Sequence, residues 1–182
     1  MTDVFILDFD GGNQLRKKIS EACCIRWHIE SDCHFSSIGS FGIVGKRMAE
    51  RLSRSSIYVV SDNDCLILGE NFVQQGLDIM ARHPDYGLLA ATSICDGYFA
   101  NGYPREGLAE VVPRHAVGGV AFVRKGILTE FKPCDVTQVD ETICHEMKLK
   151  GYKTGSMPGL RFNHIGAGYS ITNPVWWMRV PE

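Results

Sequence analysis

Hydrophobic and polar positions divide the chain into short apolar runs separated by segments with helical periodicity. Four runs rich in apolar and β-branched residues, each bounded by polar residues, are typical of buried strands and fall at residues 4–7, 57–60, 86–91 and 118–124. Residues 25–29 alternate apolar and polar side chains and predict a further strand. Strands that alternate with helices indicate an α/β fold with a mostly parallel sheet covered by helices.

Predicted helices lie between these strands. In each, apolar side chains recur at three- or four-residue spacing, which places them on one helical face. They are Leu15, Ile19 and Ala22 after a cap at Asn13, then Val44, Met48 and Leu52, then Val73, Leu77 and Met80 between Asn71 and Pro84, and finally Ile143 and Met147 before Gly151. Residues 31–42 are predicted to form a loop, and residues 92–114, rich in Gly, Pro and aromatic side chains, a functional loop.

The most informative polar residues follow the strand at 57–60. Asp62, Asn63 and Asp64 lie at the carboxyl end of that strand, which is where open α/β sheets bind ligands. Carboxylate and amide oxygens are the ligands that Mg²⁺ and Mn²⁺ prefer, usually together with a phosphate group. The same residue types also favour turns through hydrogen bonds to their own backbone, so the pattern alone leaves a plain strand-to-turn junction open.

Three candidate residues lie in the second half of the chain. Asp140 and Glu141 stand at the start of the last predicted helix, and His164 lies between a short apolar stretch and a Gly-rich turn. Carboxylates in a first helical turn also complement the helix dipole, and a single histidine is often a structural residue. The sequence alone therefore allows either a structural or a catalytic or metal-binding role for Asp140, Glu141 and His164.

Length and composition narrow the picture further. The 182 residues predict one domain, residues 1–182, with a tail at 171–182, and the 19 basic and 21 acidic residues argue against an electrostatic nucleic-acid partner. Seven scattered cysteines without a signal peptide favour a reduced, cytoplasmic chain.

No apolar run reaches the roughly 20 residues of a membrane span. Trp176 and Trp177 leave a peripheral membrane contact open, and no pattern indicates an oligomeric state.

Several separated motifs together resemble the GT-A fold glycosyltransferases, in particular the inverting family 2 type, over nearly the whole chain. Each motif is short, but their order and spacing match the family. The motifs are ILDFD ending at Asp10, Gly42 followed five residues later by Arg47, the DxD motif Asp62 to Asp64, HPDYGLL from His83 to Leu89, the Gly118–Gly119 strand with Arg124, the acidic pair Asp140 and Glu141, and NHIGAGYS with His164.

That resemblance implies a three-layer α/β sandwich of the nucleotide-diphospho-sugar transferase type. It implies Mn²⁺- or Mg²⁺-dependent transfer of a sugar from a nucleotide-sugar donor, with UDP favoured over GDP, to a hydroxyl acceptor such as a glycan, with inversion. The implied roles are donor binding for Asp8, Asp10, Arg47, Asp62 and Asn63, metal binding for Asp62, Asp64 and His164, general base for Asp140 or Glu141, and acceptor stacking for Tyr98, Phe99 and Tyr103.

Two departures and two alternatives accompany this resemblance. The acidic pair is Asp-Glu after Val139, where the family more often has Glu-Asp, so the base is expected to be either Asp140 or Glu141. In the family a strand and a helix normally precede the equivalent of residues 4–8, so the chain is expected to be a minimal version. One alternative is a non-catalytic GT-A domain that binds a sugar nucleotide or glycan. The other rests on ILDFDGG, which resembles the first motif of the haloacid dehalogenase superfamily: Asp8 would be the nucleophile and Asp10 the acid or base of a Mg²⁺-dependent phosphatase, although Gly12 replaces the usual Thr.

Overall fold

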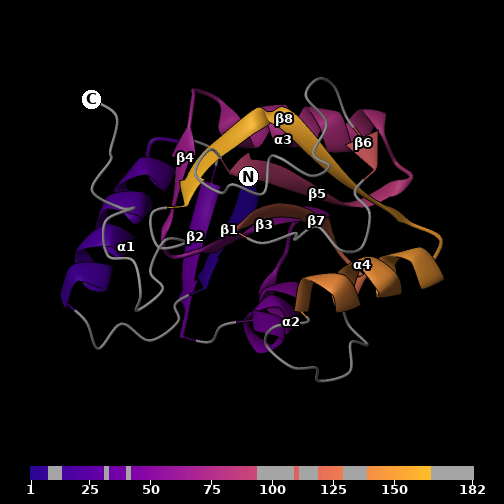
Figure 1. Ribbon diagram of the computed structural model, residues 1–182, viewed down its shortest axis with the longest axis horizontal. Helices are drawn as coiled ribbons and strands as arrows, with labels where there is room; N and C mark the ends of the chain where they lie inside the picture. Colours follow the sequence, from indigo (N-terminus) through magenta and orange to yellow (C-terminus); the bar gives the residue numbers. More distant parts are fainter. Residues whose placement is uncertain are drawn as a thin grey trace, which may run out of the picture.

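The computed structural model describes residues 1–7, 14–30, 33–39, 42–93, 109–110, 119–128 and 139–164, some of them by their backbone only (Figure 1). Helices and strands alternate through most of this range. The helices are α1 Gln14–Trp27, α2 Gly42–Leu52, α3 Phe72–Arg82 and α4 Val139–Leu149. The strands are β1 Thr2–Leu7, β2 Cys33–Ile38, β3 Ile57–Asp62, β4 Cys65–Leu68, β5 Tyr86–Ser93, β6 Ala109–Glu110, β7 Val120–Arg124 and β8 Lys153–His164.

The described strands form one mixed sheet in the order β2-β1-β3-β7-β5-β8-β4, with β6 paired to β8 off this path. Parallel pairs join β2 to β1, β1 to β3 and β5 to β8, whereas the β3–β7, β7–β5, β8–β4 and β6–β8 pairs are antiparallel. Strands β1, β2, β3, β5 and β8 therefore run in one direction. This confirms the predicted α/β fold with a mostly parallel mixed sheet.

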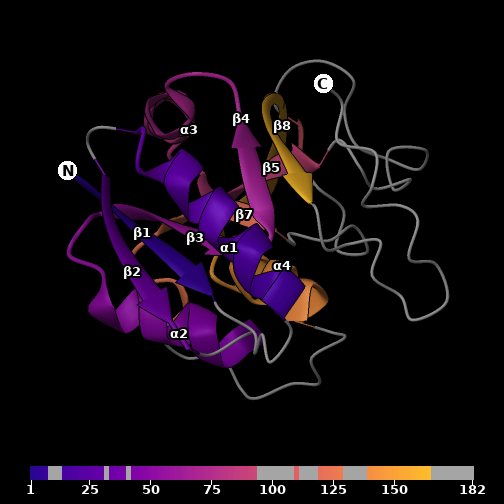
Figure 2. The same ribbon diagram turned by 90° about the vertical axis from the view of Figure 1, so that its left-hand side faces the viewer.

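The connection between β3 and β4 shows that the sheet curls. Only Asn63 and Asp64 separate these strands in sequence, yet β7, β5 and β8 lie between them in the sheet order. The far edge of the sheet must therefore return to the carboxyl end of β3. Figure 2 shows β4 beside β8, with α1 in front of the sheet.

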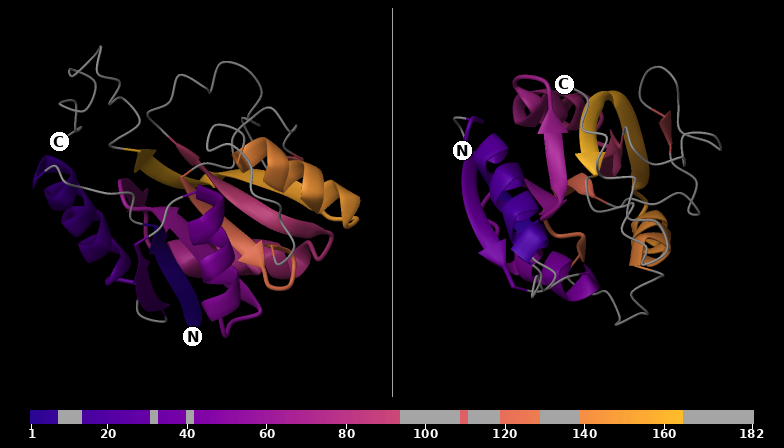
Figure 3. Two further views of the ribbon diagram at one scale, coloured as in Figure 1. Left: turned by 90° about the horizontal axis from the view of Figure 1, so that it is seen from below. Right: turned by 60° about the vertical axis from the view of Figure 1, so that its left-hand side comes forward.

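Helices cover both faces of the sheet, which gives three layers. Figure 3 shows α2 and α4 on the same side of the sheet. Successive residues of β1 point to opposite faces, as the pleat of a strand requires, so that Phe5 and Leu7 pack toward α2 and α4 while Val4 and Ile6 pack toward α1 and α3. None of the helices in the described residues combines the length and apolarity that crossing a lipid bilayer requires.

The predicted strand at residues 25–29 is wrong. Helix α1 continues to Trp27, whose side chain is fully buried, while Ile25 and Ile29 are exposed. The second strand is β2, inside the segment predicted to be a loop. Because β2 lies at an edge of the sheet and is only partly buried, its sequence CHFSSI carries no apolar run that would have marked it.

Helix α2 lies on the sheet with polar side chains inward. Its buried residues include Lys46, Ala49 and Glu50. The Glu50 carboxylate accepts hydrogen bonds from the hydroxyl of Tyr58, at 2.7 Å, and from the backbone N–H of Gly126. Burial, followed by the charge and hydrogen bond of Glu50, raises the pKa of Tyr58 far above its ordinary value, so this hydroxyl remains a donor at any physiological pH.

Asp3 in β1 fixes the residues that follow α2. Its Oδ2 accepts hydrogen bonds from the backbone N–H groups of Arg54 and Ser55, at 2.6 and 2.9 Å, and from the hydroxyls of Ser53 and Ser55, at 3.2 and 3.0 Å. Burial acts to raise the pKa of this carboxyl, but the four hydrogen bonds outweigh burial and hold the pKa below the ordinary value of 3.8.

A group whose folded-state pKa is depressed stabilises the native state above its unfolded pKa, and the contribution is lost as the pH falls through the folded value. We expect Asp3→Asn to lower the free energy of unfolding at neutral pH. The difference from the wild type should shrink once the pH falls below 3.8. Urea unfolding of both proteins across this pH range measures the effect, and a difference independent of pH would contradict the role of the charge.

Gly76 in α3 lies against the ring of Phe122 in β7. A Cβ built at this glycine would stand 2.1 Å from Cζ of that ring. Gly76→Ala gains about 1 kcal/mol of helix propensity, but overpacking costs about 1–3 kcal/mol. We therefore expect a net loss of unfolding free energy in urea titrations. Gly39→Ala, where nothing lies within 4 Å of the added Cβ, is the matched control and should change stability less.

Candidate active site

The shared direction of the strands gathers the ends of several strands at one edge of the sheet. Strands β1, β3 and β8 end there, at Leu7, Asp62 and His164, while β4 and β7 begin there, at Cys65 and Val120. Four of the candidate residues predicted from the sequence, Asp62, Asn63, Asp64 and His164, fall at or next to these strand ends. The sheet therefore concentrates the candidate chemistry at its carboxyl edge, as open α/β sheets do.

Two backbone hydrogen bonds hold the turn between β3 and β4 in place. The N–H of Asp62 donates to the carbonyl of Gly119 at 2.8 Å, and the N–H of Asn63 donates to the carbonyl of Leu7 at 3.2 Å. The turn is thus tied to the start of β7 on one side and to the end of β1 on the other. The side chain of Asn63 is buried, so it supports the turn from inside.

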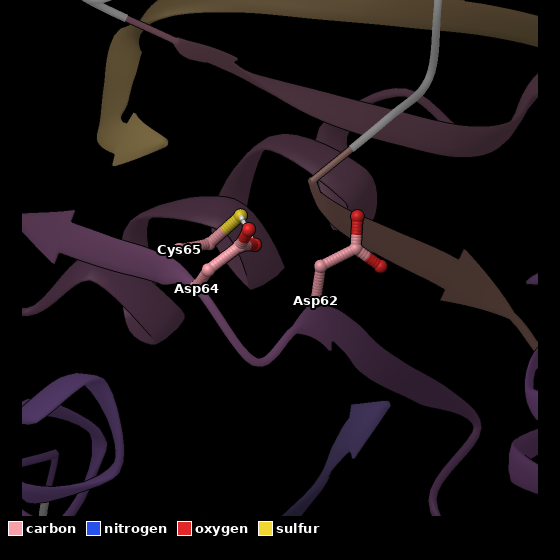
Figure 4. Close-up of side chains that lie close together, drawn as sticks. All are labelled: Asp62, Asp64 and Cys65. Atoms are coloured by element: carbon pink, nitrogen blue, oxygen red, sulfur yellow. Dashed lines mark hydrogen bonds between the residues drawn. The ribbon is translucent and has the colours of Figure 1, made fainter. Parts of the chain in front are cut away.

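The turn presents a cluster of three possible metal ligands, formed by Asp62, Asp64 and Cys65. One ligand atom from each residue lies within 4.8 Å of those of the other two. The thiol of Cys65 donates to Oδ1 of Asp64 at 3.9 Å, and Figure 4 shows these two side chains close together with Asp62 beside them. Asp64 and Cys65 are buried, whereas Asp62 is half-buried.

This donor set fits a divalent cation. Two carboxylates supply the oxygen ligands that Mg²⁺ and Mn²⁺ prefer, and the thiol adds a softer ligand that suits transition metals better than Mg²⁺. Cys65 was not among the sequence candidates, although its position directly after Asp64 was the available signal. Asp62 and Asp64 as metal ligands remain a prediction that this geometry supports.

The strand register brings His164 to the same cluster. Cys65 and His164 are paired residues in the antiparallel β4–β8 ladder. Directly opposite residues of such a ladder share a face of the sheet, with Cβ atoms about 4.5–5.5 Å apart. The backbone of His164 therefore lies opposite that of Cys65, although the two segments are far apart in sequence. The structure describes His164 by its backbone only.

The acidic pair lies at the start of α4. Asp140 is in the first turn of α4, and Glu141 follows it. Helix α4 leads into β8, whose first residue, Lys153, pairs with Tyr86 at the opposite edge. The start of α4 must then lie toward the carboxyl edge, as a base acting on a ligand there would require. The side chains of Asp140 and Glu141 lie outside the described residues.

The predicted basic residue Arg47 is not joined to the acids. It lies in the second turn of α2 and is half-buried, and within the described ranges no hydrogen bond or ion pair links it to the cluster of Asp62, Asp64 and Cys65. Its neighbour Lys46 is buried instead. A donor-binding role for Arg47 stays a prediction.

Several other candidates lie outside the described residues. These are Asp8 and Asp10, together with the aromatic residues Tyr98, Phe99 and Tyr103 of the predicted acceptor loop. Leu7, one residue before Asp8, contacts the Asn63 backbone, so the described chain reaches the site at this point.

Gly119 is a site residue that sequence periodicity does not identify. It adopts a positive φ of 88°, which side chains disfavour. A Cβ there would also stand 2.4 Å from the Phe162 ring and 3.2 Å from Sγ of Cys65. Only glycine lets the backbone come close enough for its carbonyl to accept the hydrogen bond from Asp62. The Gly118–Gly119 pair in the family resemblance was the signal for it.

A second buried thiol lies near the cluster. Burial, then the negative charge of Asp64 and then Cys24, raise the pKa of Cys23 to about 12. The Cys23 thiol is therefore neutral at physiological pH and packs as a small apolar group.

The three layers, the curled mixed sheet and the acids after β3 define the GT-A glycosyltransferase fold. Solved structures with this fold resemble the chain over most of its length. The mannosyltransferase PcManGT from Pyrobaculum calidifontis, in complex with GDP-Man and Mn²⁺, has a TM-score of 0.63 and 12% identity and covers 89% of this chain and 56% of its own. S. aureus TarS 1-349 in complex with UDP has a TM-score of 0.59 and 11% identity and covers 89% of this chain and 59% of its own.

At these identities the likeness shows the fold. The chain spans about 60% of the length of S. aureus TarS 1-349. No protein-family model matches the sequence, and no curated protein matches it.

The haloacid dehalogenase alternative loses support, because the fold is the GT-A one. In the described sheet β3 has β1 and β7 on its two sides, and the expected missing first strand stays a prediction.

Substitution of Asp64 tests whether the cluster of Asp62, Asp64 and Cys65 binds a metal ion. We expect Asp64→Asn to weaken Mn²⁺ binding by at least about tenfold, since changes even to outer-shell partners of metal ligands cost about 10- to 100-fold. Calorimetric titration or Mn²⁺ electron paramagnetic resonance measures the affinity. Asp85→Asn is the matched control, because Asp85 pairs with Lys153 at 2.9 Å at the opposite edge of the sheet. Equal affinity in both variants would exclude Asp64 as a ligand.

Proposed function

We propose that the chain is a metal-dependent glycosyltransferase that moves a sugar from a nucleotide-diphosphate sugar to a hydroxyl acceptor such as a glycan, with inversion. The observation that carries this proposal is the cluster of Asp62, Asp64 and Cys65 at the carboxyl edge of a GT-A sheet. The complexes of PcManGT with GDP-Man and Mn²⁺ and of TarS with UDP-GlcNAc support it by likeness of fold.

The acids would hold the cation next to the donor diphosphate. Asp64 and Asp62 are the proposed ligands, with Cys65 beside them and His164 opposite Cys65 in the sheet. A divalent cation at such a site acts as a Lewis acid that stabilises the charge of the departing diphosphate. We assign Mn²⁺ in preference to Mg²⁺, because the thiol is a poor ligand for the harder ion.

The turn supports this task by its rigidity. A charged ligand that is fixed before the reaction stabilises developing charge without reorganising during it. The hydrogen bonds from Asp62 to Gly119 and from Asn63 to Leu7 fix the backbone that carries the acids. Asp8, which follows Leu7 in sequence, is the proposed contact to the nucleobase, with Asp10, Arg47 and Asn63 as further donor contacts.

The acceptor hydroxyl must lose its proton as it attacks the sugar. We assign this step to Asp140, at the start of α4 and toward the edge of the sheet that carries the acids. The carboxylate would take the proton while the new glycosidic bond forms on the face opposite the departing diphosphate. Attack from that face inverts the anomeric carbon.

Donor binding and turnover can be measured separately. Thermal-shift assays with UDP- and GDP-sugars, with and without Mn²⁺, detect binding because a ligand of the native state raises its stability. Release of the free nucleotide, with and without added acceptor sugars, detects turnover. Mn²⁺-dependent turnover that Asp64→Asn abolishes supports an enzyme. Donor binding without turnover would identify the non-catalytic binding domain, and the absence of both would overturn the proposal.

The base assignment gives a further prediction. A positioned general base contributes about 10²–10⁴-fold to a rate. We expect Asp140→Asn to lower the transfer rate by that factor while the thermal shift with donor and Mn²⁺ is retained. Glu141→Gln is the matched control and should keep most of the activity. The opposite result, a large loss in Glu141→Gln only, would make Glu141 the base.

A further inference from the structure

Helix α2 turns an apolar stripe toward solvent. Val44, Met48 and Leu52 follow one another at four-residue spacing, which places them on one side of the helix. Their exposed fractions are 56%, 40% and 56%. Apolar side chains that are exposed next to one another form the kind of patch that marks an interaction surface, whereas single exposed apolar residues are ordinary.

The orientation of the helix is fixed by its inner side. Ala49 packs in the core beneath the sheet, and the buried carboxylate of Glu50 is held by the Tyr58 hydroxyl and the Gly126 backbone. The side chain of Lys125 donates to the carbonyl of Ser53 just after the helix. Rotating α2 to bury the stripe would break these contacts and expose Ala49, so the stripe faces outward as a property of the fold.

The outer side of α2 is also basic. Arg47 in the helix is half-buried, and Arg51 and Arg54 are exposed, all three within or directly after the helix that carries the stripe. The only acid of the helix, Glu50, is buried. In the part of the chain that the structure describes, no carboxylate forms an ion pair with these arginines. The surface therefore combines apolar side chains with a net positive charge.

We propose that this surface of α2, formed by Val44, Met48 and Leu52 with Arg51 and Arg54, binds the surface of an anionic lipid bilayer. A helix with an apolar stripe and basic flanks lies in the plane of the bilayer interface, with the apolar side chains among the acyl chains and the cations at the headgroups. Charge complementarity favours this occupant, because anionic headgroups attract the exposed arginines Arg51 and Arg54 that flank the stripe.

A second copy of the chain fits this surface less well. In a two-fold dimer the same surface meets itself, so arginines would face arginines. Among the described residues, the exposed acids lie on α1 or on or next to α3 and β5, which belong to other parts of the fold; they are Glu21, Glu70, Asp78 and Asp85. Self-association is therefore the competing outcome that an experiment must distinguish.

The proposed contact has a consequence for the site. Helix α2 begins at Gly42, shortly after the carboxyl end of β2, and so at the edge of the sheet where β1 and β3 also end. A bilayer along α2 would lie beside the candidate active site. The proposal itself does not depend on the proposed function, since it rests on α2 alone.

Vesicle co-sedimentation of the full chain tests the proposal. Vesicles of phosphatidylcholine alone are compared with vesicles that contain phosphatidylglycerol as well, at low and high salt. We expect binding only to the anionic vesicles, weakened by salt. Each arginine near an anionic surface changes the partition coefficient roughly fivefold, so Arg51→Glu with Arg54→Glu should lower it by at least about 25-fold. Met48→Ser with Leu52→Ser should also weaken binding.

Two control variants show whether vesicle binding depends on the stripe and its charge, rather than on exposed apolar residues or arginine side chains in general. Ile25→Ser with Ile29→Ser changes exposed apolar residues in α1 and just after it, and Arg51→Lys with Arg54→Lys keeps the charge in α2 and just after it. Both variants should bind like the wild type. All variants retain Trp176 and Trp177, so any contribution of the tail is constant.

Two results would overturn the proposal. The first is equal vesicle binding, or equal lack of it, in the wild type, in the variant with Arg51→Glu and Arg54→Glu, and in the variant with Met48→Ser and Leu52→Ser. The second is the absence of vesicle binding together with a dimer in sedimentation velocity that the Met48→Ser and Leu52→Ser changes dissociate. That result would mean that the stripe binds a second copy of the chain. Circular dichroism confirms that each variant is folded.

Discussion

The candidate site depends on two backbone hydrogen bonds that join three strands at the carboxyl edge of the sheet. The bonds from Asp62 to Gly119 and from Asn63 to Leu7 fix a turn of only two residues between β3 and β4. Because the turn is tied on both sides, Asp62 and Asp64 cannot move apart independently of the sheet. The close approach at Gly119 makes the first of these bonds possible, since a side chain there would collide with Phe162.

The same turn gathers the possible metal ligands. It places the carboxylate groups of Asp62 and Asp64 near each other and buries Asp64 beside the thiols of Cys65 and Cys23. Two carboxylates and a thiol within reach of one point are a donor set that a divalent transition metal accepts. This geometry is why the cluster carries the functional proposal.

The sequence predicted the elements that a local pattern of side chains marks. It did not predict the features that depend on how strands pair and on which side of a helix is buried. The apolar run before Asp62 predicted β3 and the site edge, because a strand buried on both faces is marked by its own residues. The edge strand β2 lacks an apolar run of this kind. Helical periodicity predicted α2 as a helix but not its orientation, in which Met48 is exposed and Glu50 is buried. The position of His164 opposite Cys65 follows from the strand register, which no local pattern encodes.

Strand β8 shows how an irregularity completes the site. It pairs in parallel with β5 as far as Phe162, and its last residues, Arg161 to His164, pair antiparallel with β4 on the other side. Within the β5–β8 ladder the register shifts, so that Ala91 pairs with Met157 but Thr92 pairs with Arg161, leaving residues 158–160 as an irregularity. Pro158 has no N–H to donate to a ladder, so regular pairing is interrupted there. Such an irregularity adds local twist and bend to a strand. It comes directly before the four residues of β8 that pair with β4, and so the segment that sets His164 opposite Cys65 begins where the regular ladder is interrupted.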